Sequence, residues 1–190
     1  YDDLRIDKHH MMVISPDEGA LNRNIYYSSA MGVDMGMFYK RRDYTRVVNG
    51  RNPIVAHEYL GDSVEGKDVF VADDIIASGD SILDLAYNLK RRKAKRVFAG
   101  ATFAFFTSGL EAFDKAYAEG VIDHVFATNL TYTPQEVLDR PWFSQADMSK
   151  YMAFVIATLN HDQSLSYLLN PWNRIEKLLT KYRADHPVED

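Results

Sequence analysis

The sequence contains no cysteine among its 190 residues. Disulfide bridges, thiol nucleophiles and zinc sites built from cysteine are therefore excluded. It also lacks an apolar run near the roughly 20 residues that a membrane-spanning helix needs. The longest, around Val97–Phe106, is interrupted by Gly100 and Thr102 and has the length of a buried strand.

A surplus of basic residues is missing as well. Lys and Arg together number 22 against 27 Asp and Glu, which gives a net charge of −5. Binding to the phosphates of nucleic acid needs a surplus of basic residues, so the composition does not indicate a nucleic-acid-binding protein. A local basic patch could still hold a small phosphorylated ligand. The chain starts at Tyr1 with no signal peptide behind it, and we expect it to be a piece of a longer protein.

Segments with strand and helix patterns alternate along the chain. The predicted strands are Met11–Ile14, Met35–Tyr39, Ile54–Leu60, Asp68–Ala72, Arg96–Phe106 and Val125–Thr128. The predicted helices are Gly19–Met31, Asp80–Lys93, Leu110–Ala118, Ser149–Leu159 and Trp172–Tyr182. This order predicts one α/β domain with a mostly parallel sheet that is flanked by helices on both faces.

The most informative segment is Val69–Ser81, in which an apolar strand leads into Asp73 and Asp74. A short loop with two hydroxyls and a glycine follows, and then the best-defined helix begins. In open α/β sheets, ligands bind beyond the carboxyl ends of the strands, and a helix amino terminus there offers unpaired N–H groups to an anion. Two carboxylates would repel a bare phosphate, but they can accept hydrogen bonds from sugar hydroxyls. The segment therefore predicts a sugar-phosphate site.

The segment resembles the phosphoribosyl-binding signature of type I phosphoribosyltransferases and ribose-phosphate pyrophosphokinases. The resemblance implies that Asp73 and Asp74 hold the ribose hydroxyls. It implies a 5-phosphate loop made of Ser78, Gly79, Asp80 and Ser81. Pyrophosphokinases usually carry glycine where Asp80 stands, and a carboxylate there weakens phosphate binding by repulsion. The alternative is a strand-end turn followed by an ordinary helix cap at Ser78 or Asp80.

Two further segments resemble the pyrophosphokinases in particular. Ser15–Gly19 with Arg23 is similar to a motif whose aspartate helps bind Mg²⁺–ATP, which gives Asp17 the metal role, although Ala20 replaces a glycine. Alternatively, Asp17 is a helix-start residue beside Pro16.

Tyr39–Asp43 resembles the flexible catalytic loop of that family. The resemblance implies that Lys40 and Arg42 neutralise phosphate oxygens during transfer, a reaction that depends mainly on positioning and charge. By composition alone, the segment would be a solvated basic loop.

The resemblance implies the carboxyl-terminal half of a ribose-phosphate pyrophosphokinase. This enzyme transfers diphosphate from ATP to the 1-hydroxyl of ribose 5-phosphate. We expect Mg²⁺ as cofactor, a cytoplasmic homo-oligomer, and no binding to nucleic acid or membrane. Residues 1–170 would form the ribose-5-phosphate-binding domain and 171–190 a helical extension, with the amino-terminal half absent and this piece alone inactive.

Two other functions stay open. A phosphoribosyltransferase would use phosphoribosyl pyrophosphate and a base, and it would need a hood over the base, for which Thr133–Trp142 is the only candidate. A non-catalytic regulatory relative is favoured by Asp80, Ala20 and Phe103, each of which departs from the family pattern.

Overall fold

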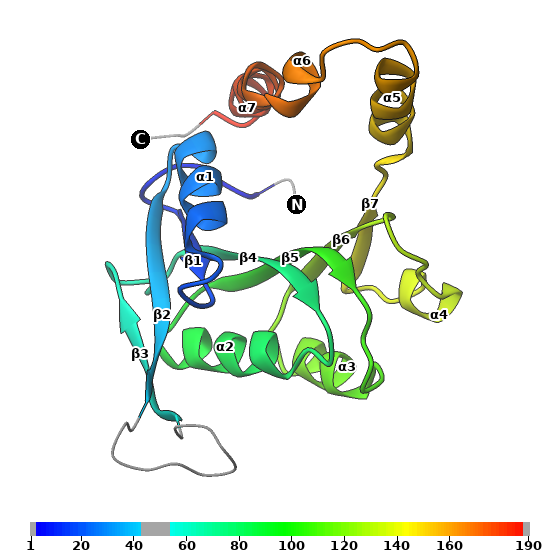
Figure 1. Cartoon of the computed structure of the whole chain (residues 1–190). Coiled ribbons are helices and arrows are strands. Elements are labelled where there is room, and N and C mark those ends of the chain that lie inside the picture. Colours follow the sequence, from blue (N-terminus) through cyan, green and yellow to red (C-terminus); the bar gives the residue numbers. More distant parts are fainter. Residues whose placement is uncertain (1–2, 43–53, 188–190) are drawn as a thin grey trace.

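The computed structural model describes residues 3–42 and 54–187 and contains one seven-stranded sheet (Figure 1). The strands lie in the order β3-β2-β1-β4-β5-β6-β7. Their bounds are β1 Met11–Ser15, β2 Asp34–Arg42, β3 Ile54–Leu60, β4 Asp68–Ile76, β5 Arg96–Ala104, β6 His124–Thr128 and β7 Phe143–Ala146. All neighbouring strands are parallel except β2 and β3.

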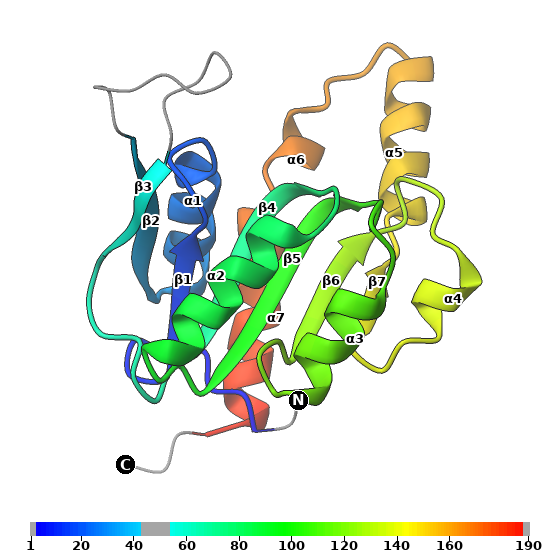
Figure 2. The ribbon, with the colours of Figure 1, turned by 90° about the horizontal axis from the view of Figure 1, so that it is seen from below.

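Helices cover both faces of this sheet. Helices α2 (Asp80–Arg91) and α3 (Glu111–Ala118) lie on one face, and α1 (Leu21–Met31) lies on the other beside α7 (Trp172–Asp185), as Figures 1 and 2 show. The remaining helices are α4 (Gln135–Leu138), α5 (Ser149–Asn160) and α6 (Ser166–Leu169). The predicted α/β class, with its mostly parallel sheet between helices, is confirmed.

The sequence pattern of α2 explains its place in the fold. Its buried residues recur at helical spacing on one side, namely Ile82, Leu83, Leu85, Ala86 and Leu89. Lys90 and Arg91 lie in its last turn, where cations suit the negative end of the helix dipole. The helix therefore packs its apolar face on the sheet and begins at the carboxyl end of β4.

An aromatic cluster fills the core beneath α3. Trp142 is fully buried, stacks on Phe113 at 5.3 Å between ring centroids, and lies edge-on to Phe106 at 5.6 Å. Its indole N–H donates to the Asp114 carboxylate at 2.7 Å, so the one polar atom of the ring is satisfied. Trp142 thereby joins the segment before β7 to α3.

Strand β4 is longer than the sequence pattern predicts. The prediction ended it at Ala72, because Asp73 and Asp74 have low strand propensity. The strand continues to Ile76, because β5 pairs with it through Ile76 opposite Ala104. The pairing overrides the local preference, so both aspartates belong to the strand rather than to the turn.

The segment Thr133–Met148 has two elements that the sequence pattern did not predict. It contains α4 and β7, and β7 pairs with β6 from Phe143 opposite Val125. Strand β2 also runs three residues past its predicted end at Tyr39, because β3 pairs with it as far as Arg42.

Helix α7 fastens the start of the described chain. The Tyr182 hydroxyl donates to the Leu4 carbonyl at 2.5 Å. The Arg183 guanidinium donates to the carbonyls of Ile6 at 3.2 Å and Met31 at 2.7 Å. Leu4 and Tyr182, which are 178 positions apart in the sequence, are thus held together. The segment before β1 therefore has a defined path along α7.

We predict that Trp142→Ala destabilises the fold by about 3–5 kcal/mol, because it leaves a large cavity and removes the hydrogen bond from the indole N–H to Asp114. Chemical denaturation followed by circular dichroism measures the change. Tyr132→Ala is the control, because that aromatic side chain is 84% exposed and its loss should cost within about 0.5 kcal/mol. Equal effects of the two substitutions would contradict the role given to Trp142.

Candidate functional site

Two adjacent carboxylates mark the carboxyl edge of the sheet. Asp73 and Asp74 follow the point where β1 stops pairing with β4, which is Ile14 opposite Val71. Because neighbouring strand residues face opposite ways, the two side chains differ in exposure: that of Asp73 is 24% exposed and that of Asp74 63%. The Asp74 N–H donates to Asp73 Oδ1 at 2.8 Å. The predicted pair therefore lies at a strand end in the centre of the sheet.

Asn24 fixes the backbone directly before this pair. Its buried amide donates to the Ala72 carbonyl at 2.9 Å and accepts from the Ala72 N–H at 3.3 Å. It also donates to the Ala20 carbonyl at 2.9 Å. Since the pairing of β1 with β4 has already ended at Ile14 and Val71, the amide takes the place of a further strand residue beside β4. Sequence reasoning missed Asn24; its only signal is an amide on the buried side of a helix, where Asn is a poor helix former.

Arg23 bridges the two aspartates from α1. Its guanidinium nitrogens lie 3.5 Å from Asp73 Oδ1 and 3.5 Å from Asp74 Oδ2. The buried Nη1 has no hydrogen-bond partner among the described residues. Arg23 therefore offsets part of the negative charge of the two aspartates.

The pKa values of the two carboxyl groups are shifted in opposite directions. Burial raises the pKa of Asp73, and neighbouring Asp74 raises it further. The hydrogen bond from Asp73 lowers the pKa of Asp74. Asp74 is therefore the better charged acceptor for a ligand hydroxyl, whereas Asp73 holds a proton more readily than an ordinary aspartate.

A rigid turn connects β4 to α2. Gly79 is the N-cap of α2 with φ +94°, and a Cβ there would lie 2.2 Å from Cε2 of Phe113. Only glycine fits, because both the backbone conformation and the space exclude a side chain. Hydrogen bonds from Phe105 N–H to Ile76 and from Thr107 N–H to Ala77 hold the turn at 2.8 and 2.9 Å. The first N–H groups of α2, which have no partners within the helix, are thus presented at one place.

Asp80 lies in the first turn of α2 and is exposed. Its Oδ2 accepts a hydrogen bond from the Ser78 hydroxyl at 2.9 Å. Since the N-cap is Gly79, neither Ser78 nor Asp80 is the cap residue that the alternative interpretation required. A negative charge therefore sits on the turn itself, at the positive end of the α2 dipole.

Asp17 contributes from the turn between β1 and α1. Its Oδ1 accepts the Ala20 N–H at 3.0 Å, as a helix-start residue would, and its charge helps to raise the pKa of Asp73. That electrostatic effect places it on the same edge of the sheet as the aspartate pair. Within residues 3–42 and 54–187, no group of three or more metal-binding side chains occurs.

Lys40 and Arg42 belong to β2, where their backbones pair with His57 and Ile54. This segment is therefore a strand end rather than the predicted loop, with a register shift between Arg41 and Arg42. Because β2 runs parallel to β1, Lys40 and Arg42 lie towards the same edge of the sheet as Asp73. Their side chains lie outside the described residues.

The comparisons with known proteins agree with this geometry. The chain belongs to the phosphoribosyl transferase domain family, which it matches over residues 1–131. Within that family it is similar to ribose-phosphate pyrophosphokinases, as the motifs predicted. It is 34% identical to the Vibrio cholerae enzyme over 160 residues and 28% identical to the Mycoplasma pneumoniae enzyme over 163 residues.

These matches cover 84% and 85% of the chain but 48% and 47% of the two enzymes. The chain thus spans about half the length of these curated relatives. The fold is similar to that of the phosphoribosylpyrophosphate synthetase from Mycobacterium smegmatis, with a TM-score of 0.65 and 22% identity. That similarity covers 80% of this chain and 45% of the synthetase.

We predict that Asp73→Asn makes the protein more stable at pH 7 than the wild type. Because the folded-state pKa of Asp73 is raised, the folded protein releases this proton at a higher pH than the unfolded chain does. Wild-type stability therefore falls as the pH rises from about 3.8 through the raised value, and asparagine removes that loss. Each 1 kcal/mol gained should raise the melting temperature by about 2–4 °C.

Thermal unfolding of both proteins between pH 3 and 8 measures this difference. The gain should disappear below pH 3.8, the ordinary pKa of an aspartate. Asp84→Asn, on the exposed side of α2, is the charge-matched control and should show no such trend. A loss of stability at pH 7 in Asp73→Asn would contradict the raised pKa.

Proposed function

We propose that this chain is the ribose-5-phosphate-binding part of a ribose-phosphate pyrophosphokinase. The whole enzyme would transfer diphosphate from ATP to the 1-hydroxyl of ribose 5-phosphate. The proposal rests chiefly on one observation: Asp73 and Asp74 stand at the end of β4, and a rigid turn then presents the amino terminus of α2. The similarity to curated pyrophosphokinases supports it.

In this proposal the two ends of the sugar phosphate bind different groups. The carboxylates of Asp73 and Asp74 accept hydrogen bonds from the ribose 2- and 3-hydroxyls. The N–H groups at Ser78–Ser81 hold the 5-phosphate, and the Arg23 guanidinium, 3.5 Å from both carboxylates, offsets part of their charge. The spacing is fixed, because Asn24 anchors β4 and hydrogen bonds from the Phe105 and Thr107 N–H groups hold the turn.

The carboxylates on this edge fit a magnesium ion. Mg²⁺ prefers oxygen ligands, and in nucleotide sites it is bound by one or two carboxylates together with substrate phosphates and waters. Asp17 has Oδ1 on the Ala20 N–H and would offer its Oδ2. The ion would supply positive charge to the phosphates, while Asp17 would place it next to Asp73.

Several parts of the proposal concern the whole protein. Lys40 and Arg42 would neutralise the transferring phosphates, and the other half of the enzyme would complete the ATP site, so this chain alone would be inactive. Residues 1–170 would form the sugar-phosphate domain and 171–190 a helical extension. We also propose a cytoplasmic homo-oligomer. Among the described residues, no helix is long and apolar enough to cross a membrane.

The non-catalytic alternative has one observation in its favour, the Asp80 carboxylate on the turn. No observation on the described residues favours the phosphoribosyltransferase alternative. The segment that would have to form its hood packs instead at the β7 edge of the sheet, with Val137 and Trp142 buried in the core (Figure 1).

We predict that the double substitution Asp73→Asn and Asp74→Asn weakens ribose 5-phosphate binding at least tenfold. It replaces charged hydrogen-bond acceptors by neutral ones, which are roughly half as strong. Isothermal titration calorimetry on the chain with Mg²⁺ measures the affinity, and circular dichroism verifies the fold. Asp84→Asn should bind like the wild type. Equal affinity of the double variant and the control would exclude these acids from the sugar site.

We predict that Asp80→Asn raises ribose 5-phosphate affinity roughly fivefold, since removing one like charge near the phosphate is worth about 1 kcal/mol at high dielectric. Asparagine can still accept the Ser78 hydrogen bond, so the turn should be retained. Affinity for ribose, which carries no phosphate, should stay unchanged in the same titration. If neither the wild type nor Asp80→Asn binds ribose 5-phosphate, the non-catalytic alternative is favoured.

A further inference from the structure

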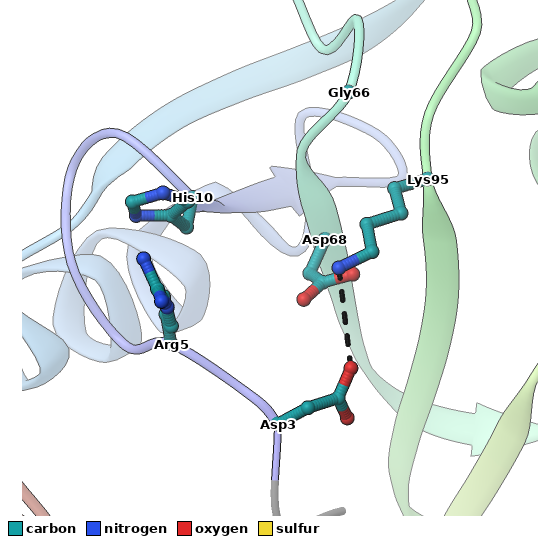
Figure 3. A pocket seen from close by; sticks show the side chains of 6 residues that line it. All are labelled: Asp3, Arg5, His10, Gly66, Asp68 and Lys95. Carbon is teal, nitrogen blue, oxygen red and sulfur yellow. Dashed lines mark ion pairs between the residues drawn. The ribbon is translucent and has the colours of Figure 1, made fainter. Parts of the chain in front are cut away.

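A charged cavity lies at the edge of the sheet opposite the aspartate pair. It has a volume of about 330 Å³ and is lined by Asp3, Arg5, His10, Gly66, Asp68 and Lys95 (Figure 3). His10 precedes β1, Asp68 begins β4 and Lys95 precedes β5, so these are the amino ends of three neighbouring strands. The sugar-phosphate site is at their carboxyl ends, and the two sites are therefore separate. The volume suits a small ligand, at the low end of the roughly 300–1,000 Å³ typical of binding pockets.

The floor of the cavity is a neutral, preformed ion pair. Asp68, whose side chain is 3% exposed, accepts two hydrogen bonds from the Arg96 guanidinium at 2.7 and 2.6 Å. This two-pronged geometry fixes the orientation of Arg96. The Nη1 atom of Arg96 also donates to Asp3, a residue that lines the cavity, at 2.7 Å.

Of the two carboxylates among the described lining residues, Asp3 is the exposed one. It is shared by Arg96 and by Lys95, whose Nζ lies 4.0 Å from Asp3 Oδ2, and the pair of Arg96 with Asp3 lowers the pKa of Asp3. Figure 3 shows Lys95 and Asp3 facing each other across the cavity. A single carboxylate thus occupies the position in which an anion would contact both cations.

Arg5 adds positive charge that this carboxylate does not offset. Its side chain forms no hydrogen bond or ion pair with any residue in the described ranges, and its guanidinium points towards His10 (Figure 3). His10 is engaged at Nδ1 by Asp7 at 2.9 Å, which leaves Nε2 for a ligand. Among the described residues, Arg5 and Lys95 of the lining, together with Arg96 beside it, stand against Asp3 and Asp68, which gives a net formal charge of +1.

Helix α7 holds this arrangement in place. Its Tyr182 and Arg183 bind the carbonyls of Leu4 and Ile6, the two residues that flank Arg5. Because both neighbours are tied to α7, the backbone that carries Arg5 has a fixed path beside the cavity. Arg5, which has no partner among the described residues, is therefore held there by the fold.

We propose that this cavity binds a small divalent oxyanion of the sulfate and phosphate class, which displaces Asp3 from Lys95 and Arg96 and takes Arg5 as a further partner. Two negative charges on one small group would satisfy all three cations, whereas the single carboxylate of Asp3 satisfies two. Planar guanidinium groups bind such oxyanions with paired hydrogen bonds. The inference does not depend on the proposed function.

The experiment is a titration of the ¹⁵N-labelled chain with sodium sulfate or inorganic phosphate at constant ionic strength, followed by NMR. We expect saturable shifts in the amides of His10, Gly66 and Lys95, and smaller ones with acetate. Arg5→Ala should weaken binding about tenfold, the usual effect of losing a charged hydrogen bond. Arg174→Ala, which removes an exposed arginine of α7, is the control.

Weaker binding by Arg5→Ala could also result from misfolding, so a second variant is needed. Asp3→Asn removes the carboxylate that competes with the anion, and it should therefore strengthen sulfate binding severalfold. Shifts confined to Ser78–Ser81 would overturn the proposal, as would equal affinities of Arg5→Ala and Arg174→Ala. Shifts at Gly66 and Lys95 caused by ribose 5-phosphate but by neither free anion would also overturn it.

Discussion

The hydrogen bonds between the Asn24 amide and both backbone groups of Ala72 are the constraint on which the candidate site depends. Where β1 stops pairing with β4, the N–H and the C=O of Ala72 would be left without partners, at a cost of about 1–3 kcal/mol each. Asn24 satisfies both from α1. It therefore lets β1 turn away towards Asp17 while β4 continues to Asp73, and the edge of the sheet opens between them.

The acids that this arrangement exposes are held at some cost to stability. Burial raises the pKa of Asp73, and Arg23 lies 3.5 Å from both carboxylates, too far for strong hydrogen bonds. Carboxylates that lack strong hydrogen-bond donors in the protein are common at binding sites, where the ligand supplies the missing donors. A sugar with two adjacent hydroxyls has the groups needed to do so. The Asp80 carboxylate is the one feature of this edge that opposes a phosphate.

Local patterns in the sequence predicted most of the architecture but not its non-local details. The period of 3.6 residues in Asp80–Arg91 and the apolar run of β5 are visible in the sequence. Phe143–Ala146 contains no β-branched residue, and it becomes a strand only because β6 offers it an edge. Asn24 reaches a residue 48 positions away, which no motif indicates. The acid pair and the glycine turn were predicted because their chemistry is local.

The most direct test of this account is a crystal structure of the chain soaked with ribose 5-phosphate and Mg²⁺. The account predicts electron density with the sugar hydroxyls on Asp73 and Asp74 and the phosphate on the N–H groups of Ser78–Ser81. Density for the sugar phosphate at another place, for example between Arg5 and Lys95, with the edge beyond β4 occupied by water alone, would contradict it.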